Sequence, residues 1–184
     1  MSTKTDLSKF NNSWYKPGGN VFTRMIWYFV NATIINSYMP FSSIKIFWLR
    51  MFGAKIGSAV VIKPKVNIKY PWRLKIGNNT WIGENVWIDN LDDVEIGNNV
   101  CISQGAMLLC GNHDYKKSSF DLIIGKIILE DGSWVGAKAV VCPGTTMKTH
   151  SVLTVGSVAS GTLESYSVYS GNKAVKVKER SLIN

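Results

Sequence analysis

The sequence predicts an all-β solenoid of six-residue repeats, and three observations support this. An aliphatic residue recurs every six residues over most of the stretch from Ile56 to Ala159. The period is interrupted only after Ile68, Ile88 and Leu108, and each of these residues closes a group of three repeats. The position four places after a repeat start mostly holds a small or β-branched residue. A period of six grouped in threes describes a triangular coil, the hexapeptide parallel β-helix, in which each repeat forms one side.

The interruptions predict a single corner from which extra residues leave the coil. Two of them add two residues and the third adds fifteen. In each case an aliphatic residue, Leu74, Val94 or Ile127, still lies two places before the next repeat start, so the coil resumes in the same way. An ordinary β-sandwich is disfavoured, because its strands alternate with a period of two and turn about every 8 to 12 residues.

The residue types fit the interior and the turns of such a coil. Branched aliphatic side chains from three sides fill the axis, and glycine or asparagine permits the tight turns between the sides. The glycines expected at the turns are Gly57, Gly77, Gly83, Gly97 and Gly136, and the asparagines are Asn78, Asn79, Asn98 and Asn99. The six-residue pattern itself does not determine the handedness of the coil. Parallel crossovers in general are right-handed, and nothing in the pattern overturns that preference.

The chain divides into three predicted regions: a helical cap over residues 1–53, the β-helix over 54–162 with a loop inserted at 110–126, and a basic tail over 163–184. Apolar residues at helical spacing predict two helices in the cap, separated near Pro40 and Ser42. These residues are Phe22, Met25, Ile26, Phe29 and Val30, then Ile44, Phe47, Trp48, Met51 and Phe52. The apolar stretch from Met25 to Phe41 is interrupted by polar residues and is shorter than a membrane span of about 20 residues.

We expect the two helices to cover the first coil. Arg24, Lys45 and Arg50 beside their apolar faces keep a peripheral membrane association open as an alternative. A polar N-terminus without an apolar core argues against a signal peptide. Three cysteines without CxxC spacing fit a reducing compartment, so the sequence predicts a cytoplasmic protein.

The formal net charge of +9 would suit a nucleic acid, an anionic membrane or an anionic cofactor. Its distribution favours the cofactor and not a nucleic acid, because basic residues gather where the coil is ending. These residues are Lys173, Lys176, Lys178 and Arg180. A solvated basic tail is the alternative interpretation.

His113 is the leading candidate for a catalytic residue. It lies in the fifteen-residue insertion, within the segment Gly-Asn-His-Asp-Tyr, and long loops in compact domains are often functional. The other histidine, His150, takes an outward position in a regular repeat. Cys110 lies at the root of the insertion and is a weaker candidate. A zinc site is set aside, because two separated histidines are too few.

The repeats, the His113 segment, and the segments Asp131 to Ala137 and Val141 to Thr145 together resemble the hexapeptide-repeat O-acetyltransferases, above all the colanic-acid-biosynthesis type. The resemblance implies a left-handed β-helix, a homotrimer, and acetyl-CoA bound in a groove between subunits. It also implies that His113 is the general base. A histidine, whose reference pKa is about 6.5, suits proton abstraction from a sugar hydroxyl at neutral pH.

By the same resemblance, residues on the last coils and the tail contact the cofactor, with the amide near Ala137 as the oxyanion donor. These residues are Gly136, Ala137, Val155, Gly156, Ser160 and Lys178. The chain departs from the family in Ser160-Gly161-Thr162 and in Gly171-Asn172-Lys173-Ala174, where one phosphate-side lysine is missing.

Acceptor contacts are expected from polar residues on the interrupted corner. The candidates are Asp89, Asn90, Asn112 and Asp114, with a role as plain turn formers as the alternative. Trp134 points outward with Trp81 and Trp87, which fits either sugar stacking or a subunit interface.

The sequence thus predicts acetyl-CoA-dependent O-acetylation of a sugar in cell-surface polysaccharide synthesis, without a metal. The acceptor would be a sugar or a lipid-linked saccharide. Two alternatives remain: an acetyltransferase acting on an antibiotic, and a non-catalytic scaffold in a polysaccharide assembly complex.

Overall fold

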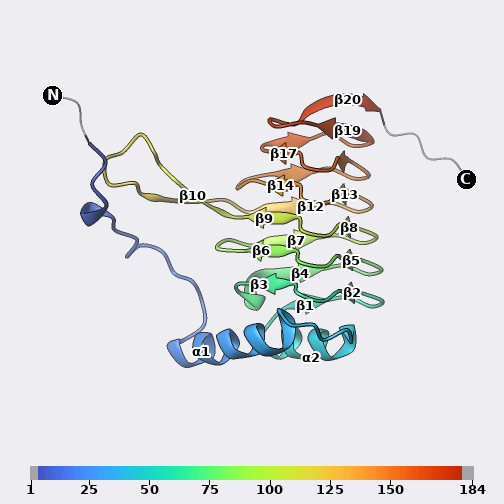
Figure 1. Cartoon of the computed structure of the whole chain (residues 1–184), viewed down its shortest axis with the longest axis horizontal. Coiled ribbons are helices and arrows are strands. Elements are labelled where there is room, and N and C mark those ends of the chain that lie inside the picture. Colours follow the sequence, from blue (N-terminus) through green and yellow to red (C-terminus); the bar gives the residue numbers. More distant parts are fainter. Residues whose placement is uncertain (1–3, 180–184) are drawn as a thin grey trace, which may run out of the picture.

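The computed structural model of the chain describes residues 4–179 and consists of a triangular β-helix with a layer of helices across one end (Figure 1). Three sheets of short parallel strands form its sides. Sheet A contains β1 (Lys55–Ile56), β4 (Leu74–Ile76), β7 (Val94–Ile96), β12 (Ile127–Leu129), β15 (Thr146–Met147) and β18 (Thr162–Leu163). Sheet B contains β2 (Val61–Ile62), β5 (Trp81–Ile82), β8 (Cys101–Ile102), β13 (Trp134–Val135), β16 (Val152–Leu153), β19 (Ser167–Ser170) and β20 (Val175–Glu179). Sheet C contains β3 (Asn67–Ile68), β6 (Trp87–Asp89), β9 (Met107–Leu109), β14 (Val140–Val141) and β17 (Val158–Ala159).

The strand register confirms that all insertions leave one corner, the one between sheets C and A. Along sheet A, Ile56 pairs with Ile76, Ile76 with Ile96, and Ile96 with Leu129. The first two coils are thus equal in length and the third is much longer, whereas the sides themselves stay in register. Leu129 then pairs with Met147 across a coil of three regular repeats. Changes in length are therefore confined to a corner, where they do not disturb the hydrogen bonds between coils.

The same corner also shortens, which the six-residue pattern did not predict. Met147 pairs with Leu163 and Leu153 with Tyr169, so the last coil is shorter than the regular coil before it. The solenoid thus continues past Ala159 through β18 and β19. β20 then turns back and pairs antiparallel with β19, covering the end of sheet B. Arg180 lies outside the described residues.

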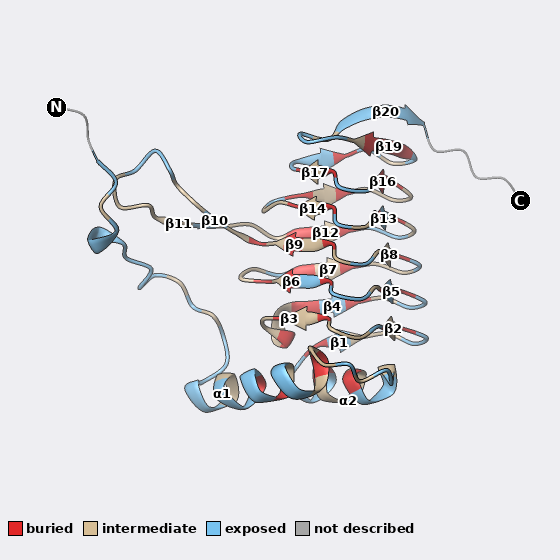
Figure 2. Cartoon of the chain, viewed as in Figure 1, coloured by how far each residue is buried: buried red, intermediate tan, exposed pale blue. Residues whose placement is uncertain are grey.

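The interior of the helix is a column of aliphatic side chains, as predicted. The repeat starts from Ile62 to Ala159 are at most 4% exposed, and Ile56 on the first coil is partly buried. The residues expected four places later are buried as well, with Thr80, Thr145, Ser151 and Ser157 as polar members. Figure 2 shows this buried face on every coil.

Glycine and asparagine hold the corner between sheets A and B. Asn79 and Asn99 adopt positive φ angles of 54°. The side chain of Asn98 accepts the amide of Asn78 at 2.8 Å, and that of Asn78 accepts the amide of Ser58 at 2.8 Å, so each asparagine ties one coil to the next. The glycines allow close approach, because a Cβ on Gly77 would lie 2.6 Å from the carbonyl carbon of Gly97.

The helices lie across the first coil, as expected, and include a π-helical turn. They are α1 (Val21–Val30), η2 (Asn31–Ile35) and α2 (Ser42–Met51), with short 3-10 turns at η1 (Leu7–Lys9) and η3 (Pro71–Arg73). Trp27 is 3% exposed and its Nε1 donates to the carbonyl of Ile68 at 3.0 Å.

The buried face of this layer differs from the expected one. Trp27, Val30, Ile35 and Leu49 pack on the coil, whereas most of the apolar residues with helical spacing face outward. Lys45 was expected beside an outer apolar face, but it is fully buried and its Nζ donates to the carbonyl of Lys63 at 2.7 Å. The helices are apolar on nearly all sides, so spacing alone could not select the buried face.

Candidate active site

The long insertion forms a β-hairpin that carries His113 away from the coil. β10 (Gly111–His113) pairs antiparallel with β11 (Leu122–Ile124), and His113 lies opposite Leu122. Figure 1 shows the hairpin projecting from the corner between sheets C and A. The insertion therefore presents its histidine well outside the body of the solenoid.

The imidazole of His113 is held in one orientation. Its Nδ1 lies 2.9 Å from the carbonyl oxygen of Phe120, and its ring stacks on the Phe120 ring at 4.4 Å with an interplanar angle of 8°. Because a carbonyl only accepts, Nδ1 must carry the proton in this contact. In the neutral ring Nε2 is then the unprotonated nitrogen, the tautomer that a general base requires.

An N-terminal arm, residues 4–19, runs from α1 along the interrupted corner to the hairpin (Figure 1). The amide of Asp6 donates to the carbonyl of Ser118 at 2.8 Å. The ring of Phe10 lies 5.7 Å from that of His113, tilted by 57°. The arm therefore supports the hairpin at its outer end.

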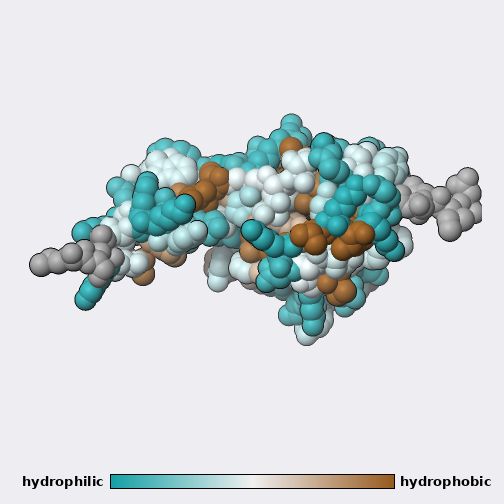
Figure 3. All heavy atoms as spheres, turned by 90° about the horizontal axis from the view of Figure 1, so that it is seen from above, coloured by the Kyte–Doolittle hydropathy of each residue, from teal (hydrophilic) through white to brown (hydrophobic). Residues whose placement is uncertain are grey.

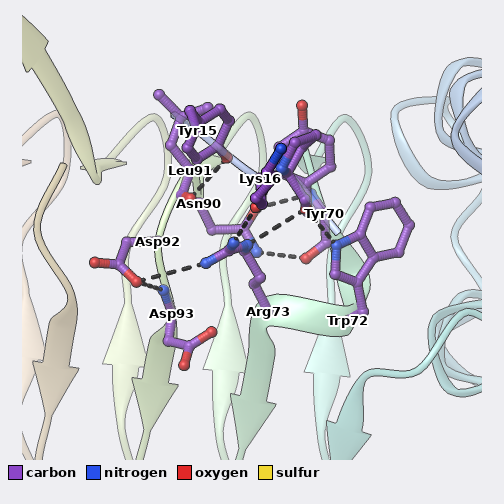
Figure 4. A network of polar contacts seen from close by, with 10 residues as sticks. Tyr15, Lys16, Tyr70, Trp72, Arg73, Asn90, Leu91, Asp92 and Asp93 are labelled. Carbon is purple, nitrogen blue, oxygen red and sulfur yellow. Dashed lines mark hydrogen bonds and ion pairs between the residues drawn. The ribbon is translucent and has the colours of Figure 1, made fainter. Parts of the chain in front are cut away.

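The two short bulges on this corner anchor the arm. Tyr15 donates its hydroxyl to the carbonyl of Leu91 at 2.7 Å, and burial raises its pKa. Arg73 donates to the carbonyl of Lys16 at 2.6 Å and pairs with Asp92 at 3.6 Å (Figure 4). Trp72 donates to the carbonyl of Pro17 at 2.8 Å. The arm thus contacts both bulges, residues 70–73 and 90–93, which gives them a structural role.

Asn90 holds the same corner together. It is fully buried, its Oδ1 accepts the amide of Tyr70 at 2.9 Å, and its Nδ2 donates to the carbonyl of Tyr70 at 2.6 Å. Figure 4 shows Asn90 beside Leu91 in one bulge, next to Tyr70 of the other. A fully buried side chain that bridges two coils in this way cannot also contact an acceptor, so its expected acceptor contact is replaced by a structural one.

Asp89, in contrast, faces a cavity on the outside of sheet C. Its Oδ1 pairs with Lys69 Nζ at 2.8 Å. The cavity, of about 500 Å³, lies between α1 and the first two coils and combines aromatic rings with charged groups. Its lining includes Arg24, Tyr28, Lys69, Tyr70, Trp87 and Asp89. Aromatic faces together with hydrogen-bonding groups of both charges suit a polar ring such as a sugar.

The other acceptor candidates lie apart from that cavity. Asn112 and Asp114 flank His113 on the hairpin, where Asn112 caps the His113 amide at 2.8 Å and Asp114 accepts the Lys116 amide at 3.1 Å. Both contacts are typical of turn formers. Trp134 is on the outer face of sheet B, 45% exposed, and its Nε1 donates to Ser103 Oγ at 2.9 Å.

The expected cofactor residues fall into three places. Gly136, Ala137, Val155 and Gly156 meet at the corner between sheets B and C, where the Gly156 amide donates to the Ala137 carbonyl at 2.9 Å. In the part of the chain that is described, the Ala137 amide has no hydrogen-bond acceptor. Ser160 lies instead on the corner between sheets C and A, and Lys178 is exposed on β20, opposite Val168.

Cys110 is not a reactive thiol in this arrangement. It is fully buried at the root of the hairpin, and burial raises its pKa to about 12. A thiol with such a pKa stays protonated near neutral pH, so Cys110 acts as a core residue.

The chain is similar along nearly its whole length to WcaF of Escherichia coli (strain K12), which is named for acetyl transfer in colanic acid biosynthesis. The two are 36% identical over 176 residues, which cover 95% of this chain and 97% of WcaF. The chain belongs to the hexapeptide-repeat acetyltransferase family. This confirms the resemblance inferred from the repeats and the His113 segment, and with it the acetyltransferase class.

Solved structures show the same fold. A hexapeptide-repeat acetyltransferase of Vibrio cholerae, in complex with acetyl-CoA, aligns with a TM-score of 0.78 at 20% identity, over 87% of this chain and 88% of the other. A galactoside acetyltransferase in complex with coenzyme A aligns with a TM-score of 0.76 at 19% identity, over 87% and 82%. No family model matches the chain.

Several residues of the site were missed by reasoning from sequence. Phe120 supplies the carbonyl that orients His113, and its φ of 53° is unusual for a bulky residue. Phe10 and Tyr15 belong to an arm that the sequence did not connect to the hairpin. The aromatic residues of the arm, in an otherwise polar segment, were the available signal.

Proposed function

We propose that this acetyltransferase transfers the acetyl group of acetyl-CoA to a saccharide hydroxyl in the synthesis of a cell-surface polysaccharide, with His113 as the general base. The observation that supports the proposal is the contact between His113 Nδ1 and the Phe120 carbonyl, which leaves Nε2 as the unprotonated nitrogen of the neutral ring. The similarity to WcaF over nearly the whole chain supports the polysaccharide context.

The reaction follows from that tautomer. His113 Nε2 takes the proton of the acceptor hydroxyl while the hydroxyl oxygen bonds to the thioester carbonyl carbon. The resulting oxyanion accepts a hydrogen bond from the Ala137 amide, which has no other acceptor among the described residues. The carbon–sulfur bond then breaks, and the imidazolium returns its proton to the sulfur, giving an acetyl ester and free coenzyme A.

We propose that the cavity beside α1 binds a part of the acceptor saccharide other than the reacting hydroxyl, with Asp89 as a hydrogen-bond acceptor and Trp87 as an aromatic platform. About 16% of the Asp89 side chain is exposed, so part of the carboxylate is accessible for this role. Acetyl-CoA would lie along the corner formed by Ala137 and Gly156, with Lys178 near its phosphates.

A homotrimer would bring these parts together. Within one chain His113 leaves the corner after sheet C, whereas Ala137 lies on the corner before it, so sheet C separates the base from the proposed oxyanion donor. A hairpin that projects from its own chain suits a site completed by a neighbouring copy. The exposed Trp81 and Trp134 on sheet B supply apolar surface for such contacts.

The test measures thiol release from acetyl-CoA in the presence of a panel of sugars and lipid-linked saccharides. We expect the His113→Ala variant to lose about a hundredfold to ten-thousandfold in rate. His150→Ala is the matched control, since His150 stacks on Tyr166 at the corner between sheets A and B. Equal rates for wild type and His113→Ala across the panel would contradict catalysis by this residue. Failure to bind acetyl-CoA in calorimetry would instead indicate a scaffold.

A further inference from the structure

The helical layer, defined as residues 21–51, exposes an unusual amount of apolar surface. Among the described residues, 11 of the 23 large hydrophobic side chains that are exposed belong to this short segment. Phe22 is 77% exposed, Phe29 63%, Phe47 57% and Met51 66%. Burial on the coil accounts for only the inner face, so the outer face has no partner among the described residues.

The exposed residues share one side of the layer. On α1, Phe22, Met25 and Phe29 lie opposite the buried Trp27 and Val30 at helical spacing. On α2, Ile44, Phe47 and Met51 lie opposite the buried Lys45 and Leu49. Figure 2 shows both helices across the end of the solenoid, with exposed residues on the side away from the coils. The result is a broad apolar face at one end of the molecule.

Basic residues without acidic neighbours surround this face. Between Asn20 and Ile68 the chain has six lysines and arginines, of which Lys45 is buried, and no aspartate or glutamate. Lys55 and Lys63 are exposed on the first coil, and Lys65 Nζ lies 4.2 Å from the centre of the Tyr38 ring in the layer. In contrast, residues 84–184 carry nine basic and eleven acidic residues. The positive charge is therefore concentrated at the helical end.

Among the described residues, the opposite end exposes Val175 and Val177 on β20 but no comparably broad apolar face. Figure 3, seen from the end that carries β20, shows a mostly hydrophilic surface with small separate hydrophobic patches. Lys148 and Lys176, near that end, are paired with Glu164 and Glu179. The two ends of the solenoid thus differ in exposed apolar surface and in charge, although both cover an end of the same stack of coils.

We propose that the helical layer docks on the surface of an anionic lipid bilayer. An apolar helical face enters the boundary between headgroups and acyl chains, and nearby lysines and arginines are attracted by anionic lipids. No described helix is long and apolar enough to cross a bilayer, so the contact is peripheral. A second copy of this chain is a less suitable partner for the apolar face, because contact between two helical layers would bring two positively charged ends together.

Docking also places the proposed acceptor site close to the membrane, a step that rests on the proposed function. Arg24, Tyr28 and Asn31 of the helical layer line the cavity that contains Asp89. A bilayer under the layer would therefore border that cavity. This geometry favours a saccharide carried on a lipid over a free sugar.

The experiment is co-sedimentation of the full-length protein with vesicles, without acetyl-CoA or acceptor. We expect binding to vesicles of equal parts phosphatidylglycerol and phosphatidylcholine, weak binding to phosphatidylcholine alone, and weaker binding when salt rises from about 0.05 M to about 0.5 M. The triple variant Phe22→Gln, Phe29→Gln, Phe47→Gln should bind at least about tenfold more weakly. A thermal melt checks that it stays folded.

The double variant Val175→Gln, Val177→Gln is the matched control, since it removes exposed apolar side chains from β20 at the other end. It should bind vesicles like the wild type, as should His113→Ala, so that failure of docking and failure of catalysis are told apart. Absence of binding by the folded wild type would overturn the proposal. So would unchanged binding of the triple variant, or self-association through this face in light scattering without vesicle binding.

Discussion

Replacing the buried lysine of the helical layer should make the protein more stable at neutral pH and change how its stability depends on pH. Lys45 is fully buried, and burial lowers its pKa to about 8 from an ordinary 10.5. At one pKa unit per roughly 1.4 kcal/mol, the folded state carries a penalty on the order of 3 kcal/mol at pH 7. Lys45→Met removes this penalty and keeps most of the apolar stem.

The substitution also removes the hydrogen bond to the Lys63 carbonyl. An acceptor left unpaired costs about 1–3 kcal/mol, so we expect a net gain of about 0–2 kcal/mol at pH 7. The contribution of Lys45 to the free energy of unfolding changes with pH in the opposite direction to that of a lysine in an ion pair. Because the folded pKa lies below the unfolded one, the wild-type penalty is complete below pH 8 and disappears as pH rises to 10.5.

The assay is chemical unfolding of wild type and Lys45→Met at several pH values from 7 to 11. The advantage of the variant should fall by about 3 kcal/mol over this range, and other titrating groups cancel in the difference. Lys55→Met, on the exposed surface of the first coil, is the control and should show no such change. The reasoning would be refuted if the difference in free energy of unfolding between Lys45→Met and wild type stayed constant with pH.

Two further predictions concern the candidate site. A Cβ on Gly136 would lie 2.6 Å from the carbonyl carbon of Thr154, so Gly136→Ala should lower the free energy of unfolding by about 1–3 kcal/mol in chemical unfolding. An unchanged free energy of unfolding would contradict this. Tyr15→Phe removes the hydroxyl bond to Leu91 and should speed limited proteolysis of the arm about fivefold, whereas unchanged cleavage would show that this bond does not anchor it.

The sides of the solenoid could be predicted from sequence because each side repeats the same burial requirement. Every coil needs an aliphatic residue at the same place, and Ile62, Ile82 and Ile102 meet it with spacings set by the register. The short step from Ala159 to Leu163 was missed because a search for a period of six does not see a shortened corner.

The helical layer shows where amphipathic reasoning fails. Phe22 and Phe29 fit a helical period as well as Trp27 and Val30 do, so the pattern predicted the helix but not its buried face. What selects the inner face is contact with the coil, such as the bond from Trp27 to the Ile68 carbonyl. Such contacts join distant parts of the chain and leave no local mark in the sequence.

The candidate site was predicted only in part for a related reason. His113 is a residue type with its own chemistry in an unusual place, and that made it visible. The Phe120 carbonyl that sets its tautomer, and the Lys16 and Pro17 carbonyls that hold the arm, are backbone groups that any residue could supply. Sequence reasoning can therefore identify the reactive side chain more readily than the groups that orient it.

The confinement of insertions to one corner explains how a rigid repeat can carry a variable site. The sides of the triangle cannot change length, because each strand bonds to the coils above and below it. The corner between sheets C and A absorbs both the long hairpin and the shortened last coil without loss of that register. It holds the His113 hairpin and the bulges that anchor the arm, so the support of the histidine can change without repacking the core. The corner between sheets B and C, with Gly136 and Ala137, keeps the regular spacing that close contact between coils demands.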